Sequence, residues 1–154
     1  METLKLSSLP PISLAVILTS LLGCYLIAKN NCHINETYVP FISSLGAHKN
    51  EDAVFCFFGN IYASCYIFYM YIYQKFLNRL VKNLGSHIKN FNCQKYLKIS
   101  KNTTFLGMLG NFGLIIICNF NSNRFPYLHY TGAAIALIFL PTYHNRHKWP
   151  TNRN

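Results

Sequence analysis

The stretch 40-PFISSLGAHKNEDAVFCFFGNIYASCYIFYMYIY-73 decides the fold, because a polar loop leads directly into 21 uncharged residues, Ala53 to Tyr73. As a helix these residues would be about 32 Å long, close to the hydrocarbon thickness of a bilayer. A soluble helix of this length would have a polar face, whereas this segment is apolar or aromatic nearly all round. The sequence therefore predicts a membrane protein.

Three further segments of similar length contain no Asp, Glu, Lys or Arg; they cover residues 9–28, 103–120 and 125–143. Together with 53–73 they predict an all-α fold, a polytopic transmembrane helical bundle with four spans. Only 12% of the chain is charged, about half the usual share of a soluble domain. The predicted transmembrane domain is 1–143, followed by a polar cytosolic tail, 144–154.

The first apolar segment, residues 9–28, resembles a secretory signal peptide as well as a membrane span. Its uncharged run is longer than the apolar core of a signal peptide, and Leu26-Ile27-Ala28 is a poor cleavage site. These observations favour a span that is retained in the protein.

The charges between the spans predict the orientation in the membrane. The region 74–101 contains seven Lys or Arg residues and no acid, whereas the loop 29–52 carries three of the four acids. The positive-inside rule therefore places 74–101 and both termini in the cytosol and 29–52 in the lumen. We expect 74–101 to be a loop whose first part continues the second helix. The charges favour a solvated cytosolic loop, and the alternative is that its basic part, 75–101, binds anionic lipid headgroups.

The formal net charge of +10 could also indicate a nucleic-acid-binding protein. In such proteins the basic residues interleave with other polar groups on a folded surface. Here they gather between apolar segments, so the expected partner is the lipid bilayer and no nucleic acid. The sequence indicates no particular protein partner.

Small residues in the third and fourth predicted spans indicate close helix packing. Gly107, Gly110 and Gly113 would weaken a soluble helix, but in a bilayer they let a neighbouring helix approach. Gly132 and Ala136 give the fourth span a similar face. We expect these faces to contact one another or another helix.

The polar residues within the predicted spans include Asn60, Asn111 and His129. Asn60 and Asn111 are expected to face another helix, because an amide that faces lipid lacks a hydrogen-bond partner. His129 has two possible roles at its depth, one facing a partner or water and the other hydrogen-bonded to a backbone or amide group near the interface.

Groups suited to catalysis or metal binding are few. His33, Glu36, His48 and Glu51 lie in the loop 29–52, but their spacing fits no recognised metal motif. Glu51 and Asp52 are expected to be solvated caps at a helix N-terminus, where the helix dipole favours negative charge. We expect no catalytic, cofactor-binding or metal site, no cofactor, and a protein that is not an enzyme.

Several short motifs occur in an order that resembles a known family. P-F-I-S-x-x-G at residues 40–46, followed by Glu51, is similar to a lumenal P-Y-I-S-x-x-G motif and the acid after it. N-F at 119–120 is similar to a signature at the end of the third helix, and H-x-x-G-A at 129–133 to a motif of the fourth. The chain thus resembles the DRAM (damage-regulated autophagy modulator) family within the FRAG/DRAM superfamily. The motif residues are Pro40, Phe41, Ile42, Ser43, Gly46, Glu51, Asn119, Phe120, His129 and Gly132.

The resemblance implies a non-enzymatic multi-pass protein of lysosomal or endosomal membranes that promotes autophagy. Other members of the superfamily imply an alternative, a factor for GPI-anchor or membrane-lipid remodelling in the Golgi or endoplasmic reticulum. Because the family has six spans, the chain is expected to be truncated after four, and a third alternative is a fragment without function.

The orientation generates a first prediction, on two acceptor sequences for N-glycosylation, Asn35-Glu36-Thr37 and Asn102-Thr103-Thr104. We expect a glycan on Asn35 and none on Asn102, because the glycosylating enzyme works on the lumenal side. Endoglycosidase should shift one band on a gel, and Asn35→Gln should abolish the shift. A shift that depends on Asn102 instead would invert the orientation of the whole chain.

Overall fold

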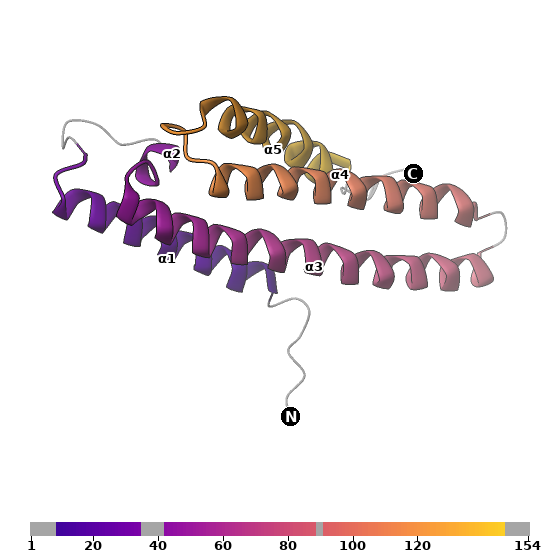
Figure 1. The fold of residues 1–154 in the computed structure, drawn as a ribbon. Coiled ribbons are helices and arrows are strands. Elements are labelled where there is room, and N and C mark those ends of the chain that lie inside the picture. Colours follow the sequence, from indigo (N-terminus) through magenta and orange to yellow (C-terminus); the bar gives the residue numbers. More distant parts are fainter. Residues whose placement is uncertain (1–8, 35–41, 89–90, 147–154) are drawn as a thin grey trace.

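Five helices account for most of the residues that the computed structural model describes, which are 9–34, 42–88 and 91–146. They are α1 (Leu9–Asn30), α2 (Ile42–Leu45), α3 (Lys49–His87), α4 (Cys93–Asn119) and α5 (Pro126–Arg146) (Figure 1). Over these residues the structure has no strand, which confirms the all-α fold class.

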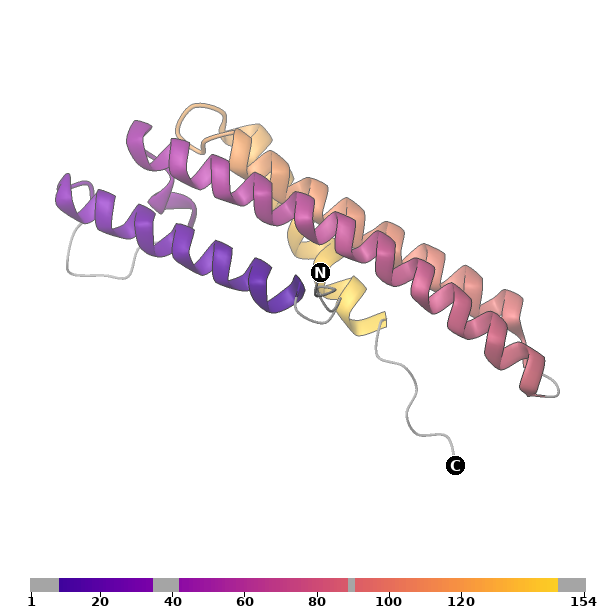
Figure 2. The same cartoon turned by 90° about the horizontal axis from the view of Figure 1, so that it is seen from below.

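The long helices pack in the order of the chain. α1 contacts α3, α3 contacts α4, and α4 contacts α5 most extensively. α3 and α4 lie side by side and antiparallel up to the turn that joins them, as Figures 1 and 2 both show. Each contact is therefore made by neighbours in sequence, as expected of helices joined by short connections.

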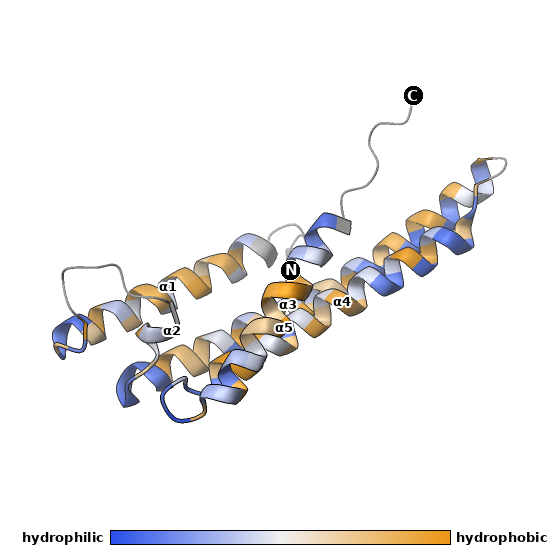
Figure 3. Cartoon of the chain, turned by 90° about the horizontal axis from the view of Figure 1, so that it is seen from above, coloured by the Kyte–Doolittle hydropathy of each residue, from blue (hydrophilic) through white to orange (hydrophobic). Residues whose placement is uncertain are grey.

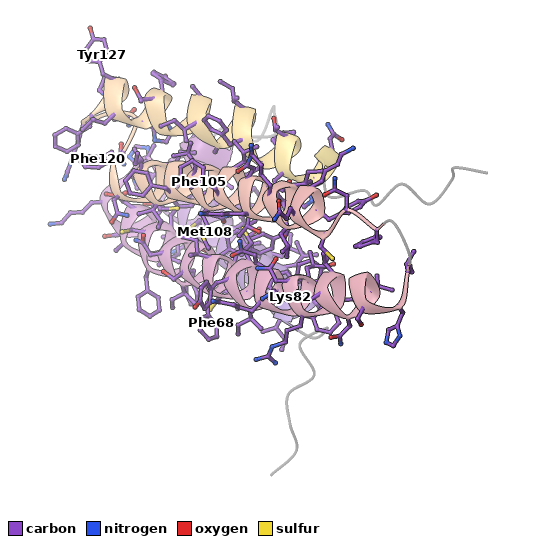
Figure 4. All side chains as sticks on the ribbon, turned by 90° about the vertical axis from the view of Figure 1, so that its right-hand side faces the viewer. Phe68, Lys82, Phe105, Met108, Phe120 and Tyr127 are labelled. Carbon is purple, nitrogen blue, oxygen red and sulfur yellow. The ribbon has the colours of Figure 1, made fainter. Side chains whose placement is uncertain are left out.

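Three of the described helices, α1, α3 and α4, are long and apolar enough to cross a membrane. Apolar residues dominate α1 in Figure 3, and large apolar side chains such as Leu22, Phe68 and Phe105 are more than half exposed. Phe68 and Tyr127 point away from the helices in Figure 4. Such surfaces are stable in contact with lipid rather than water. α5 is not among the three, so the fourth span stays a prediction.

The region 74–101 differs from the cytosolic loop expected there. α3 continues through it to His87 and α4 begins at Cys93, so most of the region is a helical hairpin. The predicted extension of the second helix is confirmed, whereas the predicted loop after it is wrong. Val81 is 1% exposed inside this hairpin, and the Cys93 thiol lies 3.5 Å from the Val81 carbonyl oxygen as a hydrogen-bond donor. These contacts, and the Asn92 side chain that caps α4, stabilise helix where charge alone indicated a loop.

α4 and α5 approach most closely at Gly113 and Gly132. A Cβ atom on Gly113 would lie 2.7 Å from both the Ala136 nitrogen and the Gly132 oxygen. These are backbone atoms and cannot move aside as a flexible side chain can. The expected close approach of a neighbouring helix to these glycines is thus confirmed, with Gly113 meeting the Gly132–Ala136 face of α5.

This contact predicts that Gly113→Ala destabilises the protein by about 1–3 kcal/mol, because the added methyl group overpacks the interface. Gly23→Ala is the matched control, since a Cβ atom there meets nothing within 4 Å and alanine favours helix. Thermal unfolding of both variants in detergent measures the difference. Equal unfolding temperatures would contradict the close contact of α4 with α5.

Candidate functional site

The motif residues that the structure describes gather at one end of the bundle. There the C-terminus of α1, the short helix α2, the N-terminus of α3 and the turn between α4 and α5 meet (Figure 1). We call the residues in contact there the motif cluster; they are Gly46, Glu51, Phe55, Asn119, Phe120, Asn121 and His129. Ile42 and Ser43 begin α2, whereas Pro40, Phe41 and the predicted glycosylation site Asn35 lie outside the described residues.

Asn121 connects the α4–α5 turn to the segment after α2 through hydrogen bonds. Its Nδ2 donates hydrogen bonds to the carbonyl oxygens of Gly46, at 2.8 Å, and Ala47, at 2.9 Å. Its Oδ1 accepts from the backbone N–H of Asn123 at 2.8 Å, and the residue is 8% exposed. The sequence analysis missed Asn121, because nothing in the turn N-S-N-R distinguishes it from an ordinary turn-forming asparagine.

Gly46 is a position where a side chain would not fit. A Cβ atom there would lie 2.9 Å from Cγ of the Phe55 ring, which is itself 7% exposed. Phe55 packs in a small core with Cys24, Leu45 and Cys118. The glycine of the P-F-I-S-x-x-G motif thus lets the loop lie directly on the first turns of α3.

His129 holds the other side of the turn. Its Nδ1 lies 2.8 Å from the Phe120 carbonyl oxygen, and the ring is 4% exposed. Because a carbonyl oxygen only accepts, Nδ1 carries the proton in this contact. This matches the second of the two roles expected of His129, a histidine bonded to the backbone near the interface.

Glu51 differs from the solvated cap expected at the start of α3, because it is fully buried. Its Oε1 lies 2.7 Å from Nδ1 of His33, and that ring stacks on His48 at a centroid distance of 4.0 Å. Oε2 has no hydrogen-bond partner. His33, which follows α1, lies over the N-terminus of α3, so one oxygen of the carboxylate is bound by a histidine instead of water.

The end of α1 places His33 over Glu51. Cys32 has a positive φ of 57°, and the N–H groups of His33 and Cys32 donate to the carbonyl oxygens of Ala28 and Lys29. These are the two hydrogen bonds of a Schellman motif, with Cys32 at the position that glycine usually occupies. The motif turns the chain back so that the His33 ring faces α3.

The electrostatics of this contact keep Glu51 ionised. Glu51 precedes the uncharged membrane segment that begins at Ala53. Burial alone would raise the pKa of its carboxyl, but the His33 hydrogen bond and the nearby histidines together lower it below the usual value. Because the pKa is lower in the folded state, ionised Glu51 stabilises the fold fully above its ordinary pKa. This stabilisation is lost only as the pH falls through the lowered pKa.

Asn119 extends the cluster into the bundle. It exchanges two hydrogen bonds with Asn60 of α3, at 2.9 and 3.2 Å, and its Oδ1 also accepts from the Cys56 thiol. The predictions that Asn60 and Asn111 face another helix are confirmed. The Asn111 amide is fully buried and lies 3.8 Å from the sulfur of Met70 on α3.

The side chains of the motif cluster mainly connect separate segments of the chain to one another. Over the described residues, no group of three or more His, Cys, Asp or Glu side chains could hold a metal ion. Its hydrogen bonds run mainly from side chains to backbone carbonyl oxygens of other segments, as at Asn121 and His129. An open pocket of about 600 Å³ beside Asn60 is lined by that amide and by small or apolar residues of α3. This arrangement fixes the helix ends relative to one another.

The fold and the cluster define a helical, multi-pass membrane protein with one end tied by side-chain contacts. The sequence matches the Frag1/DRAM/Sfk1/Cwh43P N-terminal domain over residues 5–144, so the chain belongs to this family. A curated relative is the human DNA damage-regulated autophagy modulator protein 1, which is 27% identical over 114 residues. The match covers 74% of this chain and 44% of the human protein, so the chain spans less than half the length of that relative. No solved structure matches.

The buried ion pair generates a prediction about stability. His33→Ala should lower the free energy of unfolding by about 1–3 kcal/mol, because it leaves the Glu51 carboxylate buried without its donor. In a Glu51→Gln background the same substitution should cost less, since an amide carries no charge, so the two costs should not add. His48→Ala is the control, because it removes the stacked ring and keeps the pair. Additive costs in detergent unfolding would contradict a direct coupling.

Proposed function

We propose that the protein is a non-enzymatic modulator of autophagy in lysosomal or endosomal membranes, with both termini in the cytosol. The observation that carries the proposal is the match of most of the chain to a human autophagy modulator. The match of 140 residues to the family domain supports it over the described helices as well.

The geometry of the motif cluster supports a role without catalysis. Gly46, Asn121 and His129 engage backbone groups or apolar side chains of other segments. One carboxylate oxygen of Glu51 is held by His33, which follows α1. Residues arranged in this way hold a shape, and the protein then acts through the surfaces that this shape presents.

The first experiment on this proposal is the location of the full 154-residue chain, tagged at its C-terminus, against lysosomal, Golgi and endoplasmic-reticulum markers. We expect lysosomal or endosomal residence. Residence in the Golgi, together with loss of GPI-anchored proteins from the surface on depletion, would favour lipid remodelling instead. Retention in the endoplasmic reticulum with rapid turnover would contradict the proposal.

Rescue of depleted cells tests whether the motif cluster matters for this function. Asn121→Ala removes the two hydrogen bonds to the loop and should fail to restore autophagosome clearance. Tyr127→Ala is the matched control at the start of α5, because Tyr127 is 89% exposed, and it should restore clearance. Protein levels on immunoblots show whether Asn121→Ala acts through loss of the protein. Full rescue by Asn121→Ala at equal protein level would separate the cluster from the function.

A further inference from the structure

The hairpin formed by the end of α3 and the start of α4 extends well beyond the membrane segment. α3 has 39 residues, so it is about 58 Å long, whereas its uncharged part accounts for about 32 Å. The residues from Gln74 to His87 therefore project about 21 Å past the hydrocarbon edge. α4 returns alongside from Cys93. We call this part, residues 74–101 of α3 and α4, the basic hairpin.

The register of the two helices brings the cations of the basic hairpin to matching heights. Gly59 lies against Cys118, Met70 against Gly107, and Gly85 against Cys93. Following this antiparallel register, three pairs of basic residues share a level. The inner pair is Lys75 with Lys101, the middle pair is Arg79 with Lys98, and the outer pair is Lys82 with Lys95.

All six of these side chains are exposed. The basic hairpin contains no Asp or Glu that could neutralise them. The Lys75 ammonium lies 5.2 Å from the centroid of the Tyr71 ring, which directs it toward the membrane end of the hairpin. Figure 4, seen from the end of the hairpin, labels Lys82 on α3. The result is a rigid column of positive charge with no acidic partner inside it.

Apolar side chains are exposed among these cations. Phe76, Leu80 and Ile99 are 53%, 39% and 44% exposed, at the levels of the inner and middle pairs. Such residues favour a partner that offers apolar contacts as well as negative charge beside the membrane. A lipid headgroup region contacts both kinds of side chain, because it offers phosphates outside and acyl chains beneath.

We propose that the basic hairpin binds anionic phospholipid headgroups of the leaflet from which it emerges. The Cα atoms of the inner pair stand about 3 Å beyond the hydrocarbon edge and those of the middle pair about 8 Å. The headgroup region is about 5–7 Å thick on each side, so both pairs reach it, since Lys and Arg side chains bend toward it. The outer pair, at about 13 Å, stands beyond it. The contribution of a basic pair to headgroup binding thus decreases from the inner pair to the outer pair.

The test compares two substitutions that remove the same amount of charge at different heights. The inner-pair variant is Lys75→Gln with Lys101→Gln, and the outer-pair variant is Lys82→Gln with Lys95→Gln. The full chain is purified in neutral detergent, and the affinities for fluorescent phosphatidylserine and fluorescent phosphatidylcholine are measured in mixed micelles. Circular dichroism and the Asn35 glycan report whether each variant folds and inserts as the original does.

We expect the original chain to prefer phosphatidylserine by tenfold or more at low salt. The inner-pair variant should lose tenfold or more of this preference, since each cation near a membrane surface is worth about 1 kcal/mol, or about fivefold, so that two removed together are worth up to about 25-fold. The outer-pair variant should lose less than threefold, and Lys75→Arg with Lys101→Arg should lose nothing. No preference in the original chain would overturn the proposal. So would an equal or larger loss in the outer-pair variant, which would show that contact with headgroups at the level of the inner pair does not account for the preference.

Discussion

The structure depends on the close contact that glycine permits between α4 and its neighbours. In a bilayer the helices gain no hydrophobic free energy by leaving lipid, so they associate through close packing and hydrogen bonds. α4 provides both, with Gly113 against the backbone of α5 and Asn119 paired with Asn60 of α3. Because α4 contacts both α3 and α5, its position sets the turn from which Asn121 and His129 reach the rest of the cluster.

The motif cluster connects segments that are far apart in the sequence. Asn121 is separated by about 75 residues from the carbonyl groups to which it donates, and Glu51 by 18 from His33. The Asn121 contacts bury polar groups at a low cost because those groups are hydrogen-bonded, whereas Glu51 keeps one carboxylate oxygen, Oε2, without a partner. Several of the motif residues therefore contribute to holding these segments in one arrangement.

The sequence predicted the helices well where hydropathy alone determines them, and less well where packing does. Residues 9–28 were predicted as a span and α1 covers Leu9–Asn30, because an uncharged run of this length has few alternatives. The basic region was predicted as a loop, since no charge pattern reveals that Val81 would be buried. The burial of Glu51 was also missed. This burial depends on the Schellman motif at Cys32, and the sequence has no glycine at that position to indicate the motif.

The length of α3 has a mechanical consequence. One uninterrupted helix carries Glu51 in its first turn and Arg79 and Lys82 near its other end, with no proline or other break described between them. Such a helix tilts as a rigid body, because bending it would break backbone hydrogen bonds. Over about 58 Å, a change of tilt of about 10° at one end displaces the other by about 10 Å. The two sides of the membrane are therefore connected by one rigid helix. A change in the contacts around Glu51 that tilts α3 moves the far end of the same helix.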